Sequence, residues 1–136
     1  MATASNVATY LLCRDLEIGQ QFYAALADYR LAERGPWFVL LALDGEERQR
    51  LCLVDWVSQF VPRAARGDPQ GAFLEVVVED VAAAVGAVRS FSIEITEEPI
   101  AGDAGSRATA RDPNGHMVAV TTPAARFTQP PRKTIA

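Results

Sequence analysis

The sequence contains an internal repeat with an offset of sixty-five residues. Asp15 and Asp80 each follow an apolar, strand-like run and stand where the N-cap of a helix is expected. The same offset aligns LCLVD (51–55) with HMVAV (116–120). Each copy has the order strand–helix–strand–strand–strand, and two copies fill the 136 residues. The repeat therefore predicts one domain built from two related units.

The boundaries follow from the turn signals. We expect one domain over residues 1–136, with a first unit at about 6–57, a linker at about 58–71, a second unit at about 72–122 and a C-terminal tail at 123–136. The linker is polar and contains Pro62, Gly67 and Pro69. The tail has two adjacent prolines and few large apolar side chains, so we expect it to form an extended arm.

Hydrophobic periodicity predicts the elements of each unit. In the first unit we expect strands at 7–13, 29–35, 37–44 and 50–56, with a helix at 15–29. In the second we expect strands at 71–78, 92–96, 107–112 and 116–122, with a helix at 80–91. Each unit would then be a sheet with a helix on one face. The other face must pack against another element or line a binding cavity. The pattern predicts an α+β fold in which two βαβββ units form an open, barrel-like sheet around a cavity, with the helices outside.

Composition excludes several classes of function. The formal net charge is −4 at pH 7, so we expect neither a nucleic acid nor a membrane as partner. The N-terminal stretch has no cationic region before an apolar run, and no run approaches the ~18 apolar residues of a membrane span. We therefore expect a cytoplasmic protein. Cys13 and Cys52 lie in apolar strand-like runs, where reduced, buried thiols are the expected state.

The order of elements, together with DLEIGQQFYAAL, VVVEDVAAAVGAV and RDPNGHMVAV, resembles the vicinal-oxygen-chelate superfamily. This superfamily includes glyoxalase I, extradiol dioxygenases and bleomycin-resistance proteins. The resemblance covers about residues 6–122. It implies paired βαβββ units, an open-barrel cavity and, frequently, a homodimer.

The resemblance also implies where metal ligands would stand. Metal-dependent members carry His, Glu or Gln on the first and last strands of each unit. The matching positions here are Ala8, Val54, Phe73 and Ala119, none of which has a side chain that can bind a divalent cation. The only histidine, His116, follows an Asp-Pro-Asn-Gly turn and has the strand parity opposite to Ala119. We therefore expect no metal and no other cofactor, and interpret His116 as a turn-proximal, partly solvated imidazole.

The cavity would be lined by these four positions and their neighbours two residues away. The expected ligand-binding residues are Tyr10, Cys52, Trp56, Phe73, Glu75, Met117, Ala119 and Thr121. The alternate residues of the same strands, such as Leu51, Leu53, Val118 and Val120, are almost wholly apolar and suit a helix-covered face.

Two sets of charged residues leave alternatives open. Glu75 is the candidate catalytic residue, as a general base, and can instead anchor a cationic ligand or form a structural ion pair with an arginine. Arg107 and Arg111 share a parity and can contact an anionic group or lie at a solvated strand edge.

Three functions fit these features. The first is a metal-independent protein that binds and sequesters a small organic ligand, as the resemblance to the bleomycin-resistance branch implies. The second is an enzyme, such as a glyoxalase-like lyase or isomerase that uses Glu75. The third is a dimeric interaction module with a closed cavity. We favour the first and expect a homodimer, while the identity of the ligand stays open.

Overall fold

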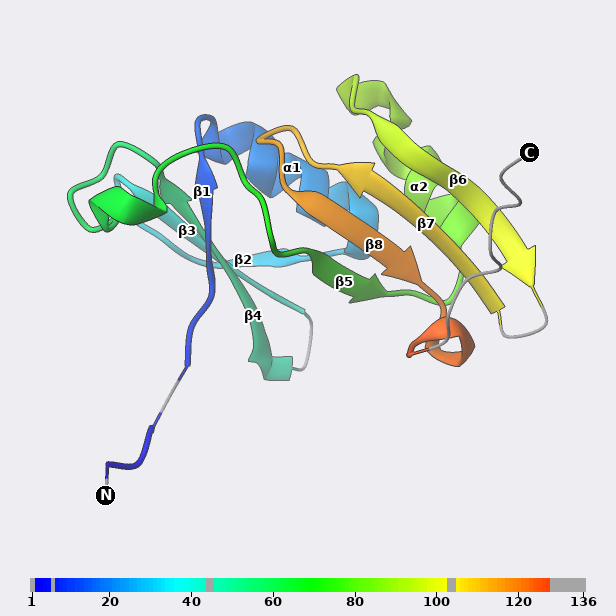
Figure 1. Cartoon of the computed structure of the whole chain (residues 1–136), viewed down its shortest axis with the longest axis horizontal. Coiled ribbons are helices and arrows are strands. Elements are labelled where there is room, and N and C mark those ends of the chain that lie inside the picture. The colour runs from blue at the N-terminus through cyan, green and yellow to red at the C-terminus, as the bar shows by residue number, and fades with distance from the viewer. Residues whose placement is uncertain (1, 6, 44–45, 103–104, 128–136) are drawn as a thin grey trace. The chain divides into compact units, whose positions relative to one another are not determined.

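The computed structural model describes residues 2–5, 7–43, 46–102 and 105–127. The chain divides into two compact units, Met1–Asp68 and Pro69–Ala136. Each unit contains one four-stranded mixed sheet and one α-helix, in the order strand–helix–strand–strand–strand (Figure 1). The predicted α+β fold of two βαβββ units is thus confirmed.

The first unit contains β1 (Tyr10–Cys13), α1 (Leu16–Ala27), β2 (Arg30–Arg34), β3 (Phe38–Leu43), β4 (Glu46–Asp55) and the short 3-10 helix η1 (Arg63–Ala65). The strands lie in the order β1-β4-β3-β2. The outer strand β1 runs parallel to β4, whereas the other two pairs are antiparallel. The crossover from β1 to its parallel neighbour contains α1, as a parallel pair requires.

The second unit contains β5 (Leu74–Val77), α2 (Val81–Val88), η2 (Arg89–Phe91), β6 (Ile95–Gly102), β7 (Gly105–Arg111), β8 (Met117–Thr121) and η3 (Pro123–Ala125). The strand order β5-β8-β7-β6 repeats that of the first unit, again with one parallel pair, β5 with β8. This correspondence is the structural form of the sequence repeat.

Both helices begin at the aspartates that mark the repeat. The carboxylate of Asp15 accepts a hydrogen bond from the Ile18 N–H at 3.1 Å, and Asp80 accepts one from Ala83 at 3.0 Å. Each bond satisfies an N–H that would otherwise lack a partner at the start of the helix. α1 ends at Ala27, before the predicted residue 29, because Asp28 adopts a left-handed conformation with φ 58°.

The core of the first unit lies between α1 and its sheet. α1 packs on β3 and β4 and buries Phe22, Tyr23 and Leu26. On the sheet, burial is complete at alternate positions, as expected when one face is covered. These positions are Val39, Leu41, Leu51 and Leu53. Each large apolar side chain buried here stabilises the unit by about 1.5–3 kcal/mol.

The core of the second unit uses smaller side chains. α2 packs on β6, β7 and β8 and buries Val81, Ala84, Val85 and Val88. The sheet residues buried on the same side are Val76, Ala108, Ala110, Val118 and Val120. Since alanine and valine carry little apolar area, this core depends on close approach of the helix to the sheet.

Several predicted boundaries are wrong. β1 begins at Tyr10 and not at residue 7, and β5 begins at Leu74, so Ala8 and Phe73 precede the strands on which they were expected. β6 begins at Ile95 instead of residue 92, because Ser92 takes a left-handed conformation with φ 55° that ends η2. The strand continues to Gly102 through Pro99, which a sheet edge tolerates because its outer backbone groups need no partner.

The start of the C-terminal tail also differs from the predicted extended arm. Pro123–Ala125 forms the turn η3, and Ala125 is buried. Residues 128–136, which contain the two adjacent prolines, lie outside the described residues.

The two units differ in the register of their parallel strands. Tyr10 pairs with Cys52 in the first unit, and the repeat offset would pair Glu75 with Met117 in the second. Glu75 instead pairs with Ala119, two residues further along β8. Because side chains alternate with a period of two, this shift keeps every residue on its expected face.

Candidate functional site

Each sheet has one face that carries the helix and one that does not, and we call the second the open face. Residues directly opposite on neighbouring strands share a face. In the second unit, the cross-strand rows Glu75–Ala119–Thr109, Val77–Thr121–Arg107 and Met117–Arg111 therefore belong to the open face. In the first unit, the rows are Tyr10–Cys52–Leu40 and Leu12–Val54–Phe38.

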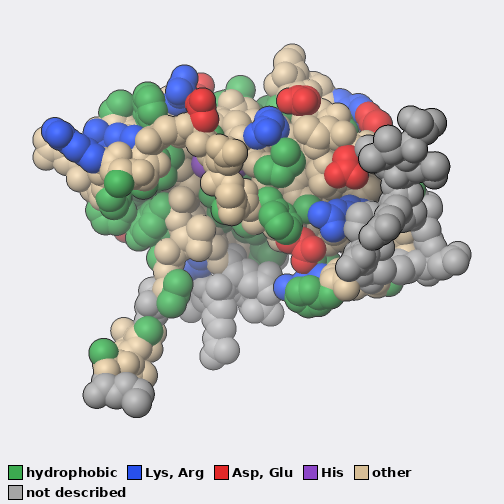
Figure 2. Space-filling view, in the orientation of Figure 1, with side chains coloured by type: hydrophobic (Ala, Val, Ile, Leu, Met, Phe, Trp, Pro, Cys, Tyr) green, Lys and Arg blue, Asp and Glu red, His purple; other side chains and the backbone are tan. Residues whose placement is uncertain are grey.

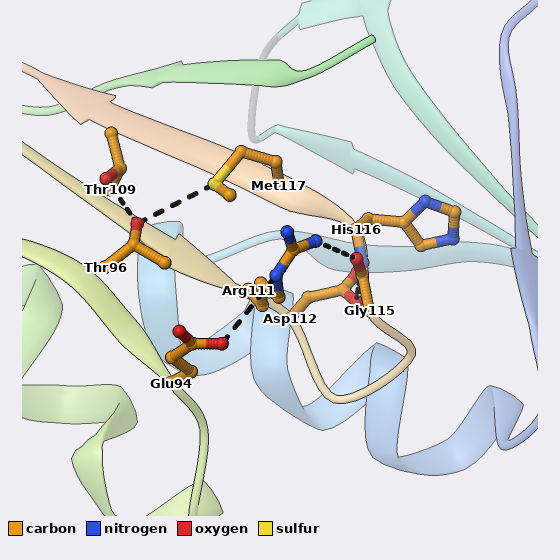
Figure 3. A network of polar contacts seen from close by, with 8 residues as sticks. All are labelled: Glu94, Thr96, Thr109, Arg111, Asp112, Gly115, His116 and Met117. Atoms are coloured by element: carbon orange, nitrogen blue, oxygen red, sulfur yellow. Dashed lines mark hydrogen bonds and ion pairs between the residues drawn. The ribbon is translucent and has the colours of Figure 1, made fainter. Parts of the chain in front are cut away.

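A polar network joins three strands on the open face of the second unit. The hydroxyl oxygens of Thr96 and Thr109 lie 2.5 Å apart, and the Thr109 hydroxyl donates to Glu97 at 3.3 Å. The Sδ atom of Met117 lies 3.8 Å from the Thr96 hydroxyl (Figure 3). Because these groups contact one another, they present hydroxyl and thioether surface in a fixed arrangement.

Glu75 makes an ion pair within its own unit. Its Oε1 atom lies 2.9 Å from Nε of Arg126, which follows η3. The Glu75 side chain is 23% exposed and that of Arg126 is 53% exposed. Of the alternatives left open for Glu75, the structure contains the ion pair with an arginine, which is Arg126. The sequence could not indicate which arginine it would be, because fifty-one residues separate Arg126 from Glu75.

The two arginines of β7, Arg107 and Arg111, differ in the polar contacts that they make. Arg111 donates to the carbonyl of Gly115 at 3.1 Å and lies 3.7 Å from the carboxylate of Glu94 (Figure 3). Arg107 is half-buried and forms no ion pair with any described residue. The structure therefore does not bring the two guanidinium groups to one common partner.

Thr121 and Ala119 are fully buried on β8. The Thr121 side chain is 0% exposed, and its hydroxyl has no hydrogen-bond partner among the described residues. A buried hydroxyl without a partner is uncommon, because the group loses its bonds to water on burial. Thr121 is thus the open-face residue whose hydrogen-bonding capacity is unused.

His116 lies beside a turn that Asp112 organises. Asp112 is buried, and its Oδ1 atom accepts hydrogen bonds from the N–H groups of Asn114 and His116, both at 2.9 Å. The imidazole of His116 is partly exposed and points away from the polar network (Figure 3). This arrangement agrees with the interpretation of His116 as a turn-proximal residue.

Aromatic side chains gather at one end of the first unit. The ring centroids of Tyr10 and Phe60 are 5.2 Å apart, and those of Trp37 and Phe60 are 5.0 Å apart. We call Tyr10, Trp37 and Phe60 the aromatic cluster. All three are exposed, Tyr10 by 40% and Phe60 by 50%. Phe60 was not among the predicted site residues because it lies in the polar loop after β4, where local sequence does not indicate packing.

The other predicted residues of the first unit have different surroundings. The guanidinium of Arg14 lies 4.5 Å from the ring centroid of Trp56, so part of this ring is covered by a cation–π contact. Cys52 is half-buried, and burial raises the pKa of its thiol, an effect that Arg50 partly opposes. A raised pKa keeps the thiol protonated at neutral pH and does not activate it as a nucleophile.

The four positions matched to metal ligands fall into two classes. Val54 and Ala119 are buried within strands, whereas Ala8 and Phe73 are exposed and precede their strands, with Phe73 62% exposed. Within the described residues, no three side chains of His, Cys, Asp or Glu gather as a metal site would require.

One face of the molecule carries charges of both signs. Basic and acidic side chains lie interspersed with hydrophobic ones on the face shown in Figure 2. Among the described residues, no helix is both long and apolar enough to cross a membrane.

No family model matches the chain, and no curated protein matches its sequence.

Several solved structures resemble this chain. A glyoxalase-related enzyme from Fulvimarina pelagi aligns with a TM-score of 0.71 at 21% identity, covering 88% of each chain. Lactoylglutathione lyase from Agrobacterium tumefaciens aligns with a TM-score of 0.61 at 19% identity, covering 93% of this chain and 99% of the other. TnmS3, an antibiotic-binding protein from Streptomyces sp. CB03234, aligns with a TM-score of 0.60 at 23% identity, covering 90% and 98%. At these identities the likeness shows the fold alone, which this chain shares with the glyoxalase-related enzyme and with the other two structures.

Proposed function

We propose that the protein binds a small organic molecule on the open face of its second unit, without a metal ion or another cofactor. The observation that carries this proposal is the contrast between the two faces of the second sheet. The helix-covered face is apolar, whereas the open face carries a carboxylate, a guanidinium, hydroxyls and a thioether in half-buried or buried positions. Polar groups in fixed, half-buried or buried positions can orient a small ligand through hydrogen bonds and ion pairs.

The first unit, taken by itself, carries a different kind of surface that we propose as a second binding surface. The aromatic cluster of Tyr10, Trp37 and Phe60 exposes ring faces and edges beside the open face. Aromatic rings bind planar or apolar ligand groups through burial and stacking. The proposed site residues therefore remain Tyr10 and Cys52 in this unit, to which we add Trp37 and Phe60.

The antibiotic-binding neighbour supports binding as a function of this fold. TnmS3 is named as an antibiotic-binding protein, and its similarity extends over nearly the whole of both chains. Other neighbours are enzymes, so the fold by itself does not separate the two functions.

The ion pair of Glu75 favours binding over catalysis by this residue. A general base must reach the proton that it removes. The Oε1 atom of Glu75 is instead 2.9 Å from Arg126, and no histidine lies among the residues of the open face. The carboxylate is better placed to attract a cationic group than to abstract a proton.

Native mass spectrometry of the purified full chain tests the proposal, with a metal assay on the same sample. We expect an organic molecule that stays bound under gentle conditions and no stoichiometric divalent metal. Dialysis against EDTA should leave the adduct and the melting temperature unchanged, because no step of binding uses a metal.

A panel of small aromatic compounds provides the second measurement, read out by quenching of tryptophan fluorescence. The substitutions Tyr10→Ala and Phe60→Ala should each weaken binding by about tenfold, since loss of an aromatic contact costs about 0.5–1.5 kcal/mol beyond its area. Val57→Ala, at an exposed residue of the same loop, serves as the matched control. Absence of an adduct together with absence of binding to every compound would contradict the proposed function.

A further inference from the structure

The segment after β8 folds back on its own sheet. Thr122–Phe127 leaves the end of β8, turns through η3 and brings Arg126 to Glu75 on β5. We call this segment the strap. It connects the chain beyond the last strand to the open face of the second unit.

The strap is attached firmly at its beginning. The Thr122 N–H donates to the Ser106 carbonyl at 3.0 Å, and the Thr122 hydroxyl accepts from the Ser106 N–H at 3.1 Å. Gly105 lies so close that a Cβ atom there would overlap the Thr122 hydroxyl. Ala125 is buried. These contacts hold the first four residues of the strap to the start of β7.

The end of the strap is held by much less. Arg126 contacts the sheet through its ion pair with Glu75, and its guanidinium also lies 4.8 Å from the ring of Phe127. Phe127 is 92% exposed and has a left-handed backbone with φ 60°. An ion pair with an exposed arginine contributes little net stability, because water competes for both charges. The ion pair can therefore break while the anchored part of the strap stays in place.

Breaking the ion pair would leave two groups on one face without partners. Glu75 and Thr121 share the open face, two residues apart in the β5–β8 register. The Thr121 hydroxyl already lacks a partner among the described residues, and Glu75 would lose the cation that now neutralises it. A carboxylate beside an unused hydroxyl is suited to a ligand that donates hydrogen bonds and carries positive charge.

We propose that the ligand of this face is an organic cation, and that its ammonium, amidinium or guanidinium group replaces Arg126 on Glu75. This inference rests on the proposed function and specifies the ligand class of the same site. Arg126 therefore competes with the ligand for the Glu75 carboxylate. The cationic group of the ligand can contact Glu75 only in the fraction of molecules in which the Arg126–Glu75 ion pair is broken, and this fraction lowers the apparent affinity.

Benzamidine and benzamide, which have nearly the same shape but differ in charge, test the inference by isothermal titration calorimetry on the full chain. Benzamidine should bind the wild-type protein more tightly than benzamide does. Arg126→Gln should lower the Kd of benzamidine by about fivefold, because it removes the competing cation. Glu75→Gln should raise that Kd by about tenfold, because the neutral amide no longer attracts the amidinium.

A second ion pair of the same unit provides matched controls. Arg89 and Glu98 form a bidentate pair at 2.8–3.0 Å on an exposed surface. Arg89→Gln and Glu98→Gln make the same charge changes away from the open face, and they should leave both Kd values unchanged. Circular dichroism and melting curves establish that each variant is folded. Since Arg126 is exposed, its variant provides a test even if Glu75→Gln fails to fold.

The results of these titrations distinguish failure of the inferred ligand class from failure of the proposed binding function. Equal benzamidine affinity in wild type, Arg126→Gln and Glu75→Gln overturns the inference. If neutral aromatic compounds still bind in that case, the proposed function stands with a different ligand class. If the adduct and all binding are absent, both are overturned.

Discussion

Thr109 and Thr121 lie on the same face of one sheet and have opposite hydrogen-bonding states. The Thr109 hydroxyl bonds to Thr96 and Glu97, whereas the Thr121 hydroxyl has no partner in the described part of the chain. Both side chains are buried. The local sequence does not indicate this difference in hydrogen bonding, since each is a threonine that directly follows an apolar strand residue.

This difference predicts opposite effects of the same substitution. Thr121→Val should raise the free energy of unfolding by about 1 kcal/mol, because it removes a buried hydroxyl that has no bond. Thr109→Val should lower it by about 1 kcal/mol, because it breaks a satisfied network. Urea denaturation of both variants measures the effects, and destabilisation by Thr121→Val would mean that the hydroxyl has a partner.

The environment of Cys52 predicts its reactivity. Burial raises the pKa of this thiol, with Arg50 lowering it to a smaller extent, so less thiolate is present at a given pH than in a free thiol. Alkylation of Cys52 in the native protein should therefore be slow at pH 7. As the pH is raised, its rate should continue to increase beyond the pH at which the rate for a free cysteine levels off. Mass spectrometry of iodoacetamide-treated protein measures the extent of this alkylation at each pH. The fully buried Cys13 should react only after unfolding, and rapid labelling of Cys52 at neutral pH would contradict the prediction.

At the scale of elements, the helices depend on their capping aspartates to different degrees. α2 has eight residues and α1 has twelve, and α2 buries only alanine and valine side chains. A short helix has fewer internal hydrogen bonds to offset the loss of a cap.

Asp80→Ala should therefore lower the stability by about 1 kcal/mol. Asp80→Asn is the matched control, because its side-chain oxygen still accepts the hydrogen bond from Ala83 and should keep most of the stability. Thermal melting of the two variants measures the difference. Equal melting temperatures for Asp80→Ala and wild type would show that the cap contributes nothing.

At the scale of the whole molecule, exposed apolar side chains point to association. Leu31, Trp37, Phe60, Phe73 and Ile100 are large and exposed. Scattered exposed apolar residues are common on monomers, whereas contiguous ones favour association, and the rings of Trp37 and Phe60 lie side by side with centroids 5.0 Å apart.

We therefore expect a homodimer. Light scattering coupled to size-exclusion chromatography should give twice the chain mass of 14.7 kDa at micromolar concentration. Trp37→Ser should shift the equilibrium towards the monomer if the aromatic cluster contributes to the interface, whereas Val57→Ser, at an exposed residue of the same unit, should have little effect. A monomer at all concentrations would contradict the expected dimer.

Most of the architecture could be predicted from sequence because it depends on local signals. The aspartate caps, the periodic apolar faces and the Asp-Pro-Asn-Gly turn act over a few residues, and each appears in the structure where the sequence indicated it. Strand limits were less accurate at residues 7–9 and 92–94, where apolar composition resembles a strand but the backbone does not pair.

The sequence alone determined that the chain consists of two βαβββ units. It also determined which residues share each sheet face, because side chains alternate with a period of two and the shift of two residues in the register of β8 leaves each side chain on the same face. Only the tertiary structure decided which groups meet. Arg126 reaches Glu75 across fifty-one residues, Phe60 joins Tyr10 and Trp37 from a polar loop, and the Thr121 hydroxyl has no partner among the residues that the structure describes. These contacts depend on how the chain returns to its own sheet, and no local pattern of residues encodes that path.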